Sequence, residues 1–112
     1  MSKFQECLDT YDKEFAKLKI KYDKKLLGAV AKGCGPSLYR VDASKVSSGD
    51  PAELARVRKN YLIKKLGLKD TPKLDEGIKA VVKQFGSSNR NKYRAMFYYL
   101  LVKHFRKASV YK

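Results

Sequence analysis

The stretch Ser87–Leu101, SSNRNKYRAMFYYLL, decides the fold. It begins with three cationic side chains within five residues, at Arg90, Lys92 and Arg94, and then becomes almost wholly apolar. At about 100° per residue, a helix through this stretch carries apolar side chains on two opposite sides. A helix that is apolar on two faces is normally buried. We therefore expect a central last helix that begins after one of the two serines, with a basic start and a buried aromatic body.

The segments before it have the start and stop signals of helices. Residues 51–66 follow an aspartate and open with proline, residues 72–85 follow a threonine and open with proline, and a glycine comes after each. Such residues are typical of helix ends, and Glu53 occupies the acidic position of a capping box. An aspartate and a glycine likewise bound a helix over about residues 24–32. We expect one domain over 1–112, all-α, a compact bundle of about five helices with the C-terminal helix central.

The first 20 residues form an amphipathic helix in this interpretation, from residue 2 to about residue 18. Its apolar side chains recur at alternating spacings of four and three: Phe4, Leu8, Tyr11, Phe15 and Leu18. Such a stripe packs against the rest of the domain or meets a second copy of the chain as a dimerisation arm. Two heptads are marginal for an independent coiled coil, so the pattern favours docking and leaves the dimer open.

The charge of the chain is its most unusual property. There are 26 Lys and Arg residues against 11 Asp and Glu residues, which gives a formal net charge of +15. Residues 87–112 contain seven of these cations and no acid. A protein with this balance attracts polyanions such as nucleic acids.

A nucleic-acid backbone is accordingly the first candidate partner. The candidate contacts lie on the helix over 51–66 and around the last helix: Arg56, Lys59, Lys64, Arg90, Lys92, Arg94, Lys103 and Arg106. If the two helices lie side by side, their cations form a stripe that tracks phosphates without reading sequence. The start of the last helix, at Ser87, Ser88 and Asn89, is also expected to offer free backbone N–H groups to a phosphate. The alternative is that the cations are dispersed over the surface.

Residues for catalysis or metal binding do not group in the sequence. The chain has a single histidine, His104, which falls on the apolar stripe of the last helix, and we expect it to be buried. Cys7 and Cys34 lie far apart and form no chelating pair. We predict no enzyme activity, no catalytic residue, no metal, no cofactor and no small-molecule substrate. A helix-turn-helix is rejected because Val82 and Lys92 do not suit its packing positions.

Membrane insertion is not expected either. The longest apolar run, residues 95–102, is far too short to span a bilayer, and the N-terminus lacks the apolar run of a signal peptide. With only two cysteines in the chain, a reducing cytoplasm fits best.

Three stretches resemble a small bacterial protein family of unknown function, about as long as this chain. They are GPSLYRVDASKVS, ELARVRKNYLIKKLGL and SSNRNKYRAMFYYLLVKHF, and the likeness covers most of residues 20–106. The resemblance implies a small, soluble, helical bacterial protein, and it brings no catalytic or binding residue.

The best interpretation is a non-enzymatic protein that binds a nucleic-acid backbone electrostatically. The alternative is a protein–protein interaction or structural module, dimeric through the N-terminal helix.

Overall fold

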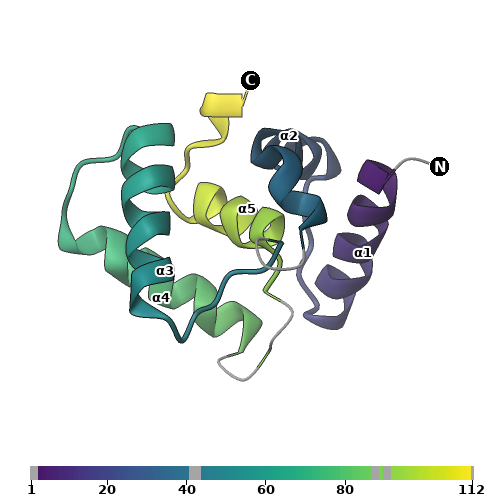
Figure 1. Cartoon of the computed structure of the whole chain (residues 1–112), viewed down its shortest axis with the longest axis horizontal. Coiled ribbons are helices and arrows are strands. Elements are labelled where there is room, and N and C mark those ends of the chain that lie inside the picture. Colours follow the sequence, from purple (N-terminus) through teal and green to yellow (C-terminus); the bar gives the residue numbers. More distant parts are fainter. Residues whose placement is uncertain (1–2, 41–43, 87–88, 90–91, 112) are drawn as a thin grey trace.

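The computed structural model describes residues 3–40, 44–86, 89 and 92–111, and these form an all-α fold (Figure 1). The α-helices are α1 (Lys3–Lys17), α2 (Lys24–Cys34), α3 (Pro51–Arg56), α4 (Pro72–Phe85) and α5 (Arg94–His104). A π-helical segment, η2 (Val57–Lys65), continues α3, and two short 3-10 helices are η1 (Gly35–Tyr39) and η3 (Ala108–Tyr111). The predicted fold class is confirmed. None of the described helices combines the length and the apolar character that crossing a bilayer requires.

Helix α5 lies at the centre of the bundle, as its two apolar faces predict. It packs against α2 on one side and against α4 on the other (Figure 1). Seven of its eleven residues are buried: Ala95, Met96, Phe97, Tyr99, Leu100, Leu101 and Val102. The Phe97 ring is stacked on Phe85 of α4, with ring centroids 6.0 Å apart. The aromatic body of the last helix is therefore core.

Helix α5 begins later than the sequence predicts. Its first residue is Arg94, and the expectation of a start after Ser87 or Ser88 is wrong. The backbone N–H of Val46 donates to the carbonyl of Lys92, and that of Arg94 donates to the carbonyl of Ser44, both at 2.7 Å. This pairing with a distant segment places Tyr93 in a β-bridge with Lys45, so the helix begins only at the next residue.

The phosphate site expected at the helix start therefore has no basis. Ser87 and Ser88 lie outside the described residues, and Asn89 precedes α5 by several residues.

The aspartate caps are confirmed, whereas the capping box is not. Asp23 accepts from the backbone N–H groups of Lys25 and Leu26 at the start of α2. Asp50 accepts from Ala52 at 3.0 Å at the start of α3. Glu53 does not return to the N-cap; it pairs with arginines instead. Its carboxylate is thereby available to tie α3 to α5.

The helix predicted over 51–66 changes its hydrogen-bond pattern halfway. The N–H of Leu66 donates to the carbonyl of Tyr61, five residues earlier, at 2.9 Å. The π-helix is rare in proteins. Where π-helical turns do occur, they are often found at functional sites. Residues four and five apart stack in this geometry, so Lys65 lies on the same face as Asn60 and Tyr61.

Helix α1 docks on its own chain. Tyr11 and Phe15 are buried, and Phe15 meets Tyr99 of α5 edge-on, with ring centroids 5.6 Å apart. The other three stripe residues, Phe4, Leu8 and Leu18, are partly buried against the same core. The two central residues of the proposed dimerisation stripe are thus covered by the bundle itself.

His104 is exposed, so the expectation of a buried histidine is wrong. Helix α5 ends at this residue, and the next ring, Phe105, packs against Gly77 of α4, with one edge of the His104 ring beside it. Gly77 makes this contact possible because any Cβ at that position would overlap the Phe105 ring.

Candidate functional site

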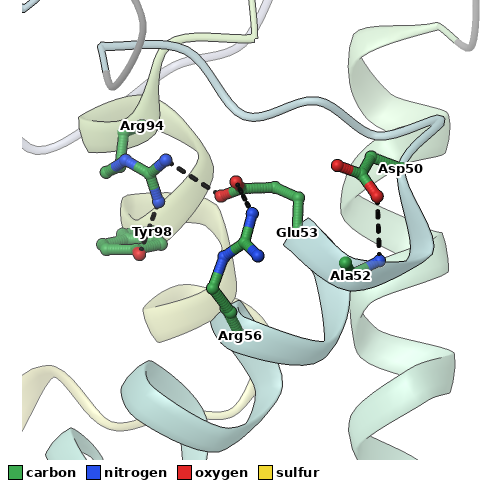
Figure 2. Close-up of polar contacts among 6 residues, drawn as sticks. All are labelled: Asp50, Ala52, Glu53, Arg56, Arg94 and Tyr98. Atoms are coloured by element: carbon green, nitrogen blue, oxygen red, sulfur yellow. Dashed lines mark hydrogen bonds and ion pairs between the residues drawn. The ribbon is translucent and has the colours of Figure 1, made fainter.

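The basic residues at the start of α5 are engaged within the protein. Figure 2 shows that Arg94 donates to Oε1 of Glu53 and to the hydroxyl of Tyr98, each at 2.9 Å. Arg56 donates to Oε2 of the same glutamate at 2.9 Å. The side chains of Arg94 and Glu53 are only 15% and 14% exposed, whereas that of Arg56 is 58% exposed. Side chains of the two helices do meet here, but an acid lies between their cations.

The charge on Glu53 is stabilised by this arrangement. Burial alone would raise the pKa of Glu53, but the hydrogen bonds from Arg56 and Arg94 outweigh burial and leave that pKa below its usual value. The carboxylate therefore stays ionised at neutral pH and holds Arg94 in place. This junction is a structural clamp between α3 and α5.

Lys92 is also internal. It is only 3% exposed, and its ammonium donates to the carbonyl of Asn89. Burial lowers the pKa of Lys92. Its side chain is not presented to a polyanion, and Arg90 lies outside the described residues.

The remaining predicted cations are exposed but fall in separate places. Lys59 and Lys64 project from η2, while Lys103 and Arg106 lie at and beyond the end of α5. The continuous stripe predicted from the sequence is therefore interrupted at the Arg94 clamp.

A different group of cations surrounds the C-terminal turn, η3. This turn lies above α5, between η2 and α2 (Figure 1). Tyr111 ties it to η2 through a hydrogen bond of 2.7 Å between its hydroxyl and that of Tyr61. The ammonium of Lys65 lies 5.3 Å from the centroid of the Tyr111 ring, a cation–π contact.

A groove of about 610 Å³ is also bordered by Tyr111. Lys25 of α2 and Lys103 of α5 line it, over a floor that includes Leu26, Ala29 and Ala108. Asp23 also lines the groove, and its carboxylate accepts the hydrogen bonds that cap α2. We call Lys25, Lys65, Lys103 and Tyr111 together the Tyr111 surface.

A second cavity, of about 290 Å³, lies between Tyr111 and the clamp. Lys65, Arg94 and the three tyrosines Tyr61, Tyr98 and Tyr111 line it. We call it the tyrosine cavity. The thiol of Cys34 also borders it, and burial raises the pKa of that thiol to about 11. A thiol with this pKa is protonated at neutral pH, so the cavity suits binding better than nucleophilic attack.

Sequence reasoning found Lys103 but not its neighbours. Lys25 and Tyr111 lie 78 and 8 residues from it along the chain, and no local pattern links them. Within the described residues, no three His, Cys, Asp or Glu side chains are grouped as a metal site. The exposed candidate binding residues that the structure describes therefore lie around the end of α5 and not at its start.

Comparison with known sequences gives a family match for the chain. No curated protein matches the chain. Residues 10–109 match a family described as "Protein of unknown function (DUF2853)". The match spans nearly the whole chain and extends past the 20–106 region that carried the resemblance, so the chain belongs to the DUF2853 family.

Proposed function

We propose that this protein is a non-enzymatic binder of nucleic-acid backbones and that it binds them through the Tyr111 surface. The observation that carries the proposal is the convergence of Lys25, Lys65 and Lys103 around one exposed turn. The three lysines come from three different elements, α2, η2 and α5. Cations brought together in this way can follow a phosphate chain, since each neutralises one phosphate and releases its counterions.

The charge around this surface supports the same function. Arg106 is exposed in the segment that joins α5 to η3, so a fourth cation belongs to the same end of the molecule. The net charge of +15 would draw a polyanion towards the protein from a distance. Tyr111 gives the surface an aromatic ring at its centre.

The alternative of a dimer through α1 receives less support. Tyr11 and Phe15 already pack inside the chain, so a partner could reach them only by displacing α1. We make no second functional proposal on that helix.

The test is a titration of a labelled DNA duplex and a labelled single-stranded RNA at two salt concentrations. Three to four phosphate contacts predict that log K falls against log salt with a slope of about −3 to −4 on the duplex. The double variant Lys25→Ala/Lys103→Ala should weaken binding at low salt and reduce the size of the slope by about 2.

The matched control is Lys73→Ala/Lys79→Ala, which removes two exposed lysines from α4, away from the C-terminal turn (Figure 1). It should leave the slope nearly unchanged. Absence of binding at low salt would overturn the proposal. Equal losses in the two double variants would also overturn it, because they would indicate diffuse attraction to the whole surface.

A further inference from the structure

The tyrosine cavity is rich in hydrogen-bond donors. Among the described residues that line it, the charged side chains are Lys65 and Arg94, and none is a carboxylate. Glu53 reaches Arg94 from outside this lining. A cavity with cations and no lining acid favours an anionic occupant.

The hydroxyl groups of the three tyrosines add further hydrogen-bond donors to the cavity. In the pair formed by Tyr61 and Tyr111, one hydroxyl donates to the other, so the accepting hydroxyl keeps its own hydrogen. Tyr98 accepts from Arg94, and its hydroxyl hydrogen has no acceptor among the described residues. Two phenol hydrogens therefore remain for a ligand or water.

These phenols hold their protons at neutral pH. Burial raises the pKa of Tyr61, Tyr98 and Tyr111 above its usual value in each case. Neutral phenols donate to an anion instead of repelling it.

The π-helical geometry of η2 completes the donor set. Asn60 and Lys65 are five residues apart and both line the cavity. In an α-helix, residues at this spacing point about 140° apart, so they would not share a cavity. The carboxamide of Asn60 and the ammonium of Lys65 make no hydrogen bond or ion pair with the described residues, and both are exposed at the rim. They are available to an incoming ligand.

We propose that the tyrosine cavity binds one small oxyanion of the phosphate class, held by Lys65, Asn60 and the free hydrogens of the phenols. A cavity of about 290 Å³ holds on the order of ten water molecules at about 30 Å³ each. A phosphate ion with a few ordered waters fits that space, whereas a nucleic-acid strand does not. The site is thus distinct from the groove lined by Lys25 and Lys103, although it shares Lys65 and Tyr111 with the Tyr111 surface.

The experiment is a calorimetric titration of the full chain with inorganic phosphate at pH 7 and low salt. We expect one site with a Kd of about 1 mM or tighter. Tyr98→Phe removes one donor without changing charge or shape, and it should weaken phosphate binding about 10-fold or more, since hydrogen bonds to charged groups are the stronger ones. Lys65→Met and Asn60→Ala change exposed side chains, so these two variants keep the fold and should also weaken binding.

The control Lys25→Ala/Lys103→Ala changes the two lysines of the nucleic-acid surface that do not line this site. It should leave the phosphate affinity unchanged while it weakens nucleic-acid binding. Tyr98→Phe should weaken phosphate binding and leave nucleic-acid binding unchanged. Titrations with dimethyl phosphate and with acetate distinguish a backbone diester and a carboxylate from a free phosphate as the source of the oxyanion. No saturable binding of any of the three probes overturns the proposal. An equal loss in the control and in Lys65→Met also overturns it, because phosphate would then be attracted only by the surface charge.

Discussion

Arg94 and Lys103 lie at opposite ends of α5, and their side chains differ in exposure and in contacts. Arg94 has a side chain only 15% exposed, between Glu53 and Tyr98. Lys103 is exposed and lines an open groove beside Tyr111. Both are cations of the same helix, yet one stabilises the bundle and the other is available to a partner.

The difference shows that burial and a nearby acid decide what a basic residue does. Charge density along the sequence is highest towards the C-terminus, but the described part of the start of α5 turns its cations inwards. Among the described residues that line the groove at Lys103, the acid is Asp23, whose side chain caps α2. A basic stretch therefore has to be divided residue by residue before it is assigned to binding.

The body of α5, between these two ends, should give the largest effect on stability. Phe97 is fully buried and stacked near Phe85, so Phe97→Ala leaves a cavity and should cost about 3–5 kcal/mol of unfolding free energy. Urea unfolding measures this value. Val110→Ala, at a side chain 37% exposed, should stay within about 0.5 kcal/mol of the wild type. A near-neutral result for Phe97→Ala would contradict the buried position of the ring.

The clamp should give the next largest effect. Arg94→Met removes the charged donor to Glu53 and Tyr98, and should cost about 1.5–3 kcal/mol. Arg56→Met removes the other arginine from the same carboxylate, but that arginine is 58% exposed and should cost only about 0–1 kcal/mol. Both values come from urea unfolding under the same conditions. Equal costs would mean that the burial of Arg94 adds nothing to its ion pair.

Local periodicity explains why the sequence predicts the core well. The alternating spacing of four and three in α1 and the two apolar faces of α5 depend on neighbours within a few turns, and Phe15 and Phe97 are buried as expected. Helix starts at Asp23 and Asp50 depend on the adjacent backbone and are equally predictable.

The candidate site depends on contacts that no local pattern contains. The late start of α5 follows from the pairing of Val46 with Lys92, and the shift to π-helical bonds at Tyr61 has no signal in the spacing. The Tyr61–Tyr111 bond joins residues 50 positions apart. Sequence reasoning therefore identified the basic character of the C-terminal region but not the lysines that converge there.

The smallest effect is expected from titration of the clamp. Because the folded pKa of Glu53 lies below its unfolded value, its contribution to stability is fully present above the unfolded pKa of about 4.3 and is lost as the pH falls through the folded pKa. The stability difference between the wild type and Glu53→Gln should therefore be largest near pH 6 and shrink below pH 4. Urea unfolding at pH 6 and pH 3.5 measures it. Glu76→Gln, at an exposed acid of α4 that makes no ion pair with the described residues, is the control and should show a small difference at both pH values. A Glu53→Gln difference that stays constant with pH would show that the carboxylate charge does not hold Arg94.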